Sequence, residues 1–464
     1  MTSRMMLLVA LCAVPLAARA QPAENPAVAP AQPAQQAQQA PPPEAAPTGF
    51  WERDTLTGNW GGLRDRLVKD GVTIALTDTG ELLSNVSGGI KTGTVVENEL
   101  LGQVDVDLDK LVGWQGGHFR VTAFDYAGHG LTLGNVGSIL TVSGIEAPLP
   151  SYRFWELWLE QSIFADKAAL RLGLLAIDAA GFMTTVTGAL FVGSTFGFPD
   201  GPAANLPQGG PAYPLSAPGV MLTVHATDTL TFMGALLSGD PAGLPGATFP
   251  PEYYPTGTVF SFNGGVMAVA QANLALNQGD NAKGLPASFK FGGWFNTSNH
   301  FIDYSTENNP VPTSHQGNWG LYATAEGMLY RVPGTKDHGL SGFARLFVSP
   351  PTQNLVNDYA DTGLVYKGAI PGRGDDLVGV AFAYAHISSS AQAADEAQQA
   401  VNPFYPVRNK EMLLEVTYQA ALAPWWTLQP VAQRWFQPGG NVLNPNGTVR
   451  EKAVVVGLRT GVTF

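Results

Sequence analysis

Cysteine and charged residues are both scarce in this sequence. The chain has 464 residues with one cysteine, Cys12, and only 13% of its residues are Asp, Glu, Lys or Arg. Cys12 falls in a segment typical of a cleaved leader, so the mature chain would have no disulfide and no thiol nucleophile or ligand. Acidic residues (37) outnumber basic ones (25), which argues against nucleic acid as a partner.

Long hydrophobic runs are missing as well. After the amino terminus, no uninterrupted apolar stretch approaches the ~20 residues that a membrane-spanning helix needs. The chain is nevertheless 45% hydrophobic and holds 54 Gly and 35 Pro, a composition that favours many strands and turns. Because alternating strands dilute the hydropathy signal, a transmembrane β-barrel is compatible with this composition.

Catalytic and metal-binding motifs are absent. The seven His residues are dispersed, and neither H-E-x-x-H nor G-x-S-x-G occurs, which argues against an outer-membrane lipase or protease. Asp105, Asp107 and Asp109 invite a calcium interpretation. However, alternate strand residues lie about 7 Å apart on one face, and no Gly turn or closing Glu follows. We therefore predict a non-enzyme without metal or cofactor.

Residues 1–20 have the features of a secretory signal peptide. Arg4 supplies the positive start, Met5–Leu16 the apolar core, and Ala18–Ala20 an A-x-A-like cleavage site. Residues 21–48 are rich in Pro, Ala and Gln, and cannot form a core. This disordered arm is either a passive spacer or a periplasmic arm that touches the cell wall or another partner.

The pattern of residues 49–71 predicts a short helix at the periplasmic mouth of a barrel. Asn59 or Gly58 can cap it, Gly71 can end it, and Trp60 and Leu63 begin its apolar face. A core helix of a soluble domain is the competing interpretation.

Residues 72–464 predict the barrel itself, an all-β, antiparallel transmembrane fold of about sixteen strands. The candidate strands have period-two character and cover residues 72–84, 96–109, 118–127, 152–162, 168–179, 218–225, 229–239, 263–276, 286–295, 317–330, 339–349, 355–368, 374–388, 408–422, 425–437 and 452–464.

The connections between these strands alternate in length. Those after odd-numbered strands are mostly long, at 128–151, 180–217, 240–262, 296–316 and 389–407, whereas those after even-numbered strands are short. Outer-membrane barrels place long loops outside and short turns in the periplasm, and a soluble sandwich has no reason to do so. Connection 350–354 breaks the alternation, so it marks a possible misassigned pair of strands.

The last stretch, Lys452 to Phe464, has the clearest two-sided pattern. Val454, Val456 and Leu458 begin an apolar face, while Arg459 lies on a face of small or polar residues. This pattern suits a strand between lipid and a wet lumen, and such a strand can close the barrel against the first one. A half-buried strand of a soluble sandwich is the alternative.

Alternation also predicts which side chains face the lumen. The candidate pore-lining residues are Glu81, Asp105, Asp107, Arg120, Glu156, Trp158, Glu160, Arg171, Arg345, Glu415 and Arg459. For each of these residues there are two interpretations: the side chain contacts the solute, or it is a solvated group that only keeps the wall of the lumen wet. The longest connection, 180–217, is the candidate constriction loop, with Phe182, Phe191 and Phe196 as apolar anchors; an external lid is its alternative.

The ordered set of short motifs along the chain resembles the OprB-type carbohydrate-selective porins of Gram-negative outer membranes. The resemblance covers Leu56 to Phe464 and rests on Leu56–Arg64, Gly80–Glu81, Asn85–Gly89, Gly113–Gly117, Trp158–Gln161, Gly188–Phe191, Thr195–Pro199, Pro424–Pro430 and Pro438–Gly440. It implies a sixteen-stranded barrel through which small sugars diffuse into the periplasm. It also implies that the barrel-assembly machinery reads the terminal Phe464.

We therefore predict an outer-membrane porin for small sugars, secreted through a cleaved signal peptide and surrounded by outer-membrane lipid. A general or ion-selective porin and a structural anchor are the alternatives. Selectivity is expected to come from Arg120, Arg171 and Arg345 facing Asp105, Glu156 and Glu160 across a narrowed lumen, because charges of both signs favour neutral polyols over ions.

Overall fold

The computed structural model describes residues 49–146, 151–241, 256–258, 260–262, 264–279, 282–299, 301–306, 314–444 and 446–464. The signal peptide at 1–20 and the arm at 21–48 lie outside the described residues, so both stay predictions.

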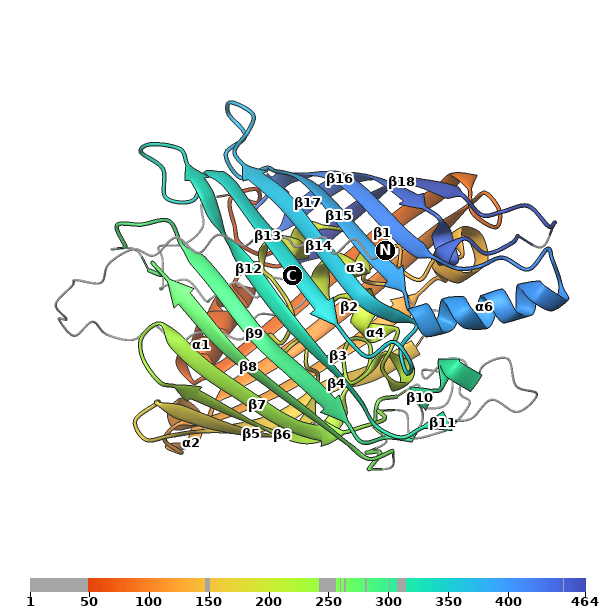
Figure 1. Ribbon diagram of the computed structural model, residues 1–464. Coiled ribbons are helices and arrows are strands. Elements are labelled where there is room, and N and C mark those ends of the chain that lie inside the picture. Colours follow the sequence, from red (N-terminus) through yellow and green to blue (C-terminus); the bar gives the residue numbers. More distant parts are fainter. Residues whose placement is uncertain are drawn as a thin grey trace. The chain divides into compact units, whose positions relative to one another are not determined.

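Within this part of the chain, sixteen strands form one closed antiparallel barrel (Figure 1). They are β1 (Val72–Gly88), β2 (Gly93–Asp107), β3 (Gly117–Ala127), β4 (Ser151–Ile163), β5 (Ala168–Leu175), β6 (Ala217–His225), β7 (Leu230–Ser238), β8 (Val266–Leu276), β9 (Ala287–Asn296), β12 (Asn318–Arg331), β13 (Gly339–Val348), β14 (Val356–Lys367), β15 (Leu377–Ile387), β16 (Lys410–Ala423), β17 (Trp426–Phe436) and β18 (Lys452–Thr463).

Each predicted strand overlaps one barrel strand, and the long connections leave from one end of the barrel. Several details of the prediction were wrong, including strand ends: β1 continues to Gly88 and not 84, and β5 ends at Leu175 and not 179. The 350–354 connection joins a correctly assigned pair, because β13 and β14 are hydrogen-bonded neighbours. The second strand ends at Asp107 and not at 109, because Asp107 caps the short helix α2 (Leu108–Val112).

The remaining helices are short, and most lie in the connections. They are η1 (Trp60–Gly62), α1 (Leu63–Lys69), η2 (Thr132–Val136), η3 (Thr187–Leu190), α3 (Ser194–Gly197), α4 (Asp200–Ala203), η4 (Pro207–Gly209), η5 (Tyr304–Thr306), α6 (Ser389–Val401) and η6 (Pro438–Gly440). Two further strands, β10 (Phe301–Ile302) and β11 (Ser314–His315), pair with each other in the connection between β9 and β12. None of the described helices is long and apolar enough to cross a membrane.

The first and last strands close the barrel as the pattern of the last strand predicts. Glu81 of β1 lies opposite Arg459 of β18. On β18, Ala453 and Val455 are fully buried, whereas Val456 and Leu458 are each 40% exposed. The amino-terminal helix α1 lies beside this seam, where Arg64 donates a 2.7 Å hydrogen bond to the terminal carboxylate of Phe464. The helix expected in 49–71 is thus present, but it begins at Leu63 after Gly62 and not after Gly58 or Asn59, and one of its side chains holds the carboxyl terminus.

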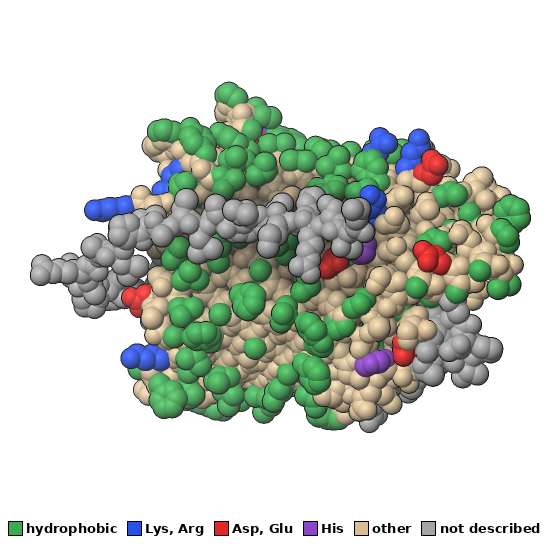
Figure 2. Space-filling model, in the orientation of Figure 1, with side chains coloured by type: hydrophobic (Ala, Val, Ile, Leu, Met, Phe, Trp, Pro, Cys, Tyr) green, Lys and Arg blue, Asp and Glu red, His purple; other side chains and the backbone are tan. Residues whose placement is uncertain are grey.

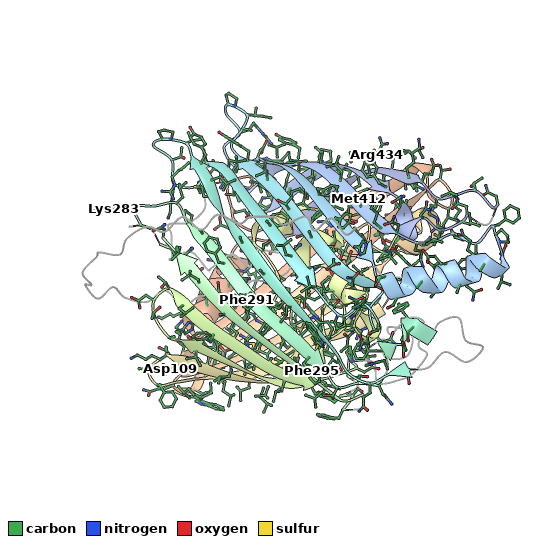
Figure 3. All side chains as sticks on the ribbon, in the orientation of Figure 1. Asp109, Lys283, Phe291, Phe295, Met412 and Arg434 are labelled. Atoms are coloured by element: carbon green, nitrogen blue, oxygen red, sulfur yellow. The ribbon has the colours of Figure 1, made fainter. Side chains whose placement is uncertain are left out.

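The outer face of the wall is mainly hydrophobic in the view of Figure 2. Phe291 and Phe295 of β9, labelled in Figure 3, are 64% and 50% exposed. One apolar residue departs from the expected alternation. Trp155 is only 4% exposed and packs against Phe124 and Tyr213, because a bulge between β3 and β4 turns it inward.

Candidate functional site

Two connections fold into the barrel instead of standing outside it. They are residues 128–146, between β3 and β4, and residues 176–216, between β5 and β6; we call them the first and second inward loops. They contact each other through backbone hydrogen bonds, from Gly144 N–H to the carbonyl of Val192 (3.0 Å) and from Ser194 N–H to that of Thr141 (3.3 Å). Together they fill part of the lumen.

Arg345 of β13 holds the second inward loop. Its guanidinium pairs with Asp361 of β14, and neither side chain has exposed surface. The same guanidinium donates to four loop carbonyls, those of Met183, Thr195, Phe196 and Gly197, over 2.7–3.2 Å. Arg345 therefore lies beneath the loop, and the expectation that it faces solute is corrected.

Carboxylates on β16 hold both loops from the other side. Glu415 accepts hydrogen bonds from the backbone N–H groups of Val192 (2.7 Å) and Gly193 (2.8 Å) in the second loop. Glu411 accepts hydrogen bonds from the N–H groups of Ile139 and Leu140 in the first loop, at 2.8 and 2.7 Å. Both glutamates are fully buried, so Glu415 also contacts the loop and not the open lumen.

A lysine completes this set of loop anchors. Lys290 of β9 donates to the carbonyls of Gly181 (2.9 Å) and Thr184 (2.8 Å). The three aromatic residues expected to anchor the loop, Phe182, Phe191 and Phe196, are buried as expected, since each is at most 2% exposed. Buried wall charges thus satisfy the loop backbone, while aromatic side chains fill the space around it.

A row of polar side chains on β2 to β5 forms a separate feature, which we call the polar wall. Arg120 pairs with Asp105 at 2.5 Å and Arg171 pairs with Glu160 at 2.8 Å. Both guanidiniums lie over the ring of Trp158, at 5.1 Å for Arg120 and 3.9 Å for Arg171. The carboxylates are the more open partners, with side-chain exposures of 29% for Asp105 and 20% for Glu160.

Three further candidates border this wall. Glu156, 2% exposed, accepts a 3.3 Å hydrogen bond from the indole N–H of Trp158. Arg459 pairs with Glu81 across the barrel seam, and its guanidinium also points towards the carbonyl of Val192 at 3.4 Å. The Arg459–Glu81 pair thus also contacts the second inward loop.

Two expectations about the charges require correction. Asp107 does not line the wall, because its carboxylate accepts from the backbone N–H groups of Asp109 and Lys110 and caps α2. The arginines also do not face the carboxylates across the lumen. Arg120 and Arg171 pair with carboxylates of the neighbouring strand, since residues directly opposite on adjacent strands lie close enough for ion pairs.

Sequence reasoning missed the first inward loop and the anchors Lys290, Glu411 and Asp361. A signal for the loop was present, because Leu131, Leu140 and Val142 are apolar residues in a connection expected to be solvated. Among the described residues, no group of three or more His, Cys, Asp or Glu side chains could hold a metal ion.

Two buried aspartates lie in the second loop. Asp178 accepts a 3.0 Å hydrogen bond from the N–H of Tyr213, and Asp200 accepts one of 2.6 Å from the N–H of Thr141. Burial raises the pKa of each carboxyl to about 7, since a low-dielectric site disfavours the charged form. Asp200 thus joins the two inward loops through a group that titrates near neutrality.

Comparisons with known proteins agree on one family. The model of the OprB family of carbohydrate-selective porins matches residues 92–464. Porin B of Pseudomonas aeruginosa is 26% identical over 85% of this chain and 88% of its own length, and the putative porin QuiX of Acinetobacter baylyi is 20% identical over 84% and 90%. The high-pH structure of Pseudomonas putida OprB matches with a TM-score of 0.77 at 22% identity, over 90% of this chain and 100% of that one, which supports the fold.

Replacing Arg345 with Leu should release the second inward loop. The change leaves the Asp361 carboxylate unpaired and buried, and such a loss costs about 3–5 kcal/mol. We expect a lower unfolding temperature and a larger single-channel conductance. Arg373→Leu removes an arginine that pairs with Asp376 in a short turn, so it serves as the control and should change conductance little. Unchanged conductance in a folded Arg345→Leu protein would contradict the anchoring role.

The contact between the inward loops should loosen as pH rises. In the closed loop the raised pKa keeps the Asp200 carboxyl protonated up to about pH 7. In the released loop the same carboxyl loses its proton near its usual pKa of 3.8. The closed state is therefore favoured at low pH and loses stability between about pH 4 and pH 7. Hydrogen exchange in 176–216, corrected for intrinsic rates, should be slower at pH 5 than at pH 8. Asp200→Asn should reduce this difference, whereas Asp166→Asn, in an exposed turn, should not; faster exchange at pH 5 would refute the assignment.

Proposed function

This chain belongs to the OprB family of carbohydrate-selective porins, and we propose that its selectivity for sugars arises at the polar wall beside the second inward loop. The protein is an outer-membrane β-barrel that admits small sugars by diffusion, and its family suggests a channel and not an enzyme. The observation that carries the proposal is the arrangement of Arg120, Trp158 and Arg171, with Asp105 and Glu160 as ion-pair partners.

Trp158 is a positioning residue of this wall and not itself a contact for sugar. Its side chain is only 5% exposed, and guanidiniums from the strands on either side lie against its ring. Cation–π contact and the two ion pairs fix the orientation of both planar guanidiniums. Trp158 therefore orients the arginines. Arg120 and the more open carboxylates Asp105 and Glu160 make the hydrogen bonds to solute, while the buried Arg171 holds Glu160 in place.

The wall offers donors and acceptors side by side. Neighbouring sugar hydroxyls each donate and accept, so a guanidinium next to a carboxylate can bind a pair of them. Charges of both signs in one row avoid the strong single-sign field that would select ions. Each contact must stay weak, since conduction needs release as well as binding.

The carboxyl terminus supports a second, separate proposal on assembly. The backbone of Phe464 is held at the seam by a 2.9 Å hydrogen bond to the carbonyl of Leu76 and by Arg64. Phe464 continues the outward-facing row of β18, where the barrel-assembly machinery can reach it before closure. A cell-wall contact through residues 21–48 lies outside the described residues and stays a proposal.

Replacing Arg120 and Arg171 together with Ala should slow glucose uptake more than glycerol uptake. A hydrogen bond to a charged group contributes about 1.5 kcal/mol, so the loss for glucose should be on the order of tenfold. The ion preference should also shift towards cations, because Asp105 and Glu160 lose their partners. Liposome swelling and reversal potentials measure the two effects.

The matched control is the double replacement with Lys, which keeps both charges but removes the planar forks. It should keep the ion preference of the parent protein while losing most of the glucose preference. If the double Ala protein keeps both its sugar ranking and its ion preference, these arginines are only solvated wall charges.

A further inference from the structure

Three cations lie on the outer surface of the barrel at its long-loop end. They are Lys410, the first residue of β16, Arg434 near the end of β17, and Lys452, the first residue of β18. Their sequence neighbours Glu411, Trp435 and Ala453 have no exposed surface and face the lumen. Because successive side chains of a strand point to opposite faces, the three cations point outward.

The strand register brings these residues to one area. Lys452 pairs with Phe436, so Arg434 is its diagonal neighbour on the same face, about 7–8 Å away. Lys410 lies two strands from Lys452 and is offset by two residues, since Met412 pairs with Phe436. At about 4.8 Å between strands and 3.3 Å per residue, this places Lys410 roughly 12 Å from Lys452.

The three cations have no anionic partner in the described part of the chain. No ion pair includes Lys410, Arg434 or Lys452, and the guanidinium of Arg434 lies over the ring of Phe436 at 5.0 Å. The exposed Glu451 precedes Lys452 in the chain, and Asp358 lies 3.7 Å from His386, the β15 residue that pairs with Lys410. Figure 2 shows Lys and Arg side chains over β16 to β18 with one acidic side chain beside them, and Figure 3 places Arg434 near Met412 towards the end that carries α6.

The surface around this cationic cluster is apolar and faces the lipid. Val416, Val456 and Leu458, further along the same strands, are 40–48% exposed. A cation on the lipid face costs about 2–4 kcal/mol at the middle of a bilayer but only about 0–1 kcal/mol near its interface. The cluster at the strand ends therefore lies at headgroup depth, where long basic side chains can reach anionic groups.

We propose that Lys410, Arg434 and Lys452 bind the phosphate groups of a phosphorylated lipid headgroup in the outer leaflet. Charge complementarity and depth carry this inference, since the cations are unpaired and border the hydrocarbon-facing wall. Arg434 presents a planar fork that suits a phosphate, and the two lysines add point charges around it. The site is separate from the pore, so lipid binding and sugar uptake are independent.

Native mass spectrometry of the detergent-purified protein tests this proposal. The probes are a lipid with two headgroup phosphates, a zwitterionic lipid with the same acyl chains, and inorganic phosphate as a competitor. The parent protein should retain the phosphorylated lipid in preference to the zwitterionic one. The triple variant Lys410→Ala, Arg434→Ala, Lys452→Ala should lose affinity on the order of a hundredfold, since each basic residue near an anionic surface contributes about fivefold.

Two control variants keep the result interpretable. The charge-conserving variant Lys410→Arg, Arg434→Lys, Lys452→Arg should retain the lipid, and Lys69→Ala with Lys283→Ala, which removes exposed lysines outside the cluster, should do the same. Glucose uptake by the triple Ala variant should match the parent and so report a folded barrel. Equal retention of both lipids, full retention by the triple Ala variant, or displacement of the lipid by millimolar inorganic phosphate would overturn the proposal.

Discussion

A guanidinium without exposed surface must find partners for its charge and for its N–H donors, and Arg345 finds them in Asp361 and in the backbone of the second inward loop. The alternative, an unpaired charge in a buried site, is too costly to persist. The loop is therefore fixed to the wall by the need to satisfy buried charges. Glu415, Glu411 and Lys290 apply the same constraint at other points of the wall.

This constraint divides the lumen into two regions with different chemistry. On β9, β13 and β16, buried wall charges bind loop backbone, and Asp361 of β14 pairs with one of them, Arg345, so these charges have no capacity left for solute. On β2 to β5 the charges pair with each other, and Arg120, Asp105 and Glu160 remain partly open. Sugars then meet a surface of oriented arginines and carboxylates, while the loops fill part of the lumen.

Strand alternation predicted most of the barrel and the direction of most charged side chains. It could not predict how far the lumen is filled, because that depends on the path of two loops with no period of their own. The alternation of side chains along the strands placed Arg345 and Glu415 inward. They contact protein and not water because the second inward loop packs against them. Asp107 and Trp155 were misplaced for local reasons. A helix cap and a β-bulge override the two-residue period, and the Asp107–Gly113 segment did contain a cap followed by a terminating glycine.

The central claim is that a loop fixed inside the barrel forces solutes against the polar wall. Liposome swelling with a protein that lacks residues 203–209, around the buried Leu206 of the second inward loop, tests it most directly. The panel should pair each sugar with a polar solute of matched size, and a heat-modifiable barrel would show correct folding. The account predicts faster permeation of every solute and a flattened ranking between sugars and their matched partners. A shortened protein that retains the sugar ranking of the parent would contradict it.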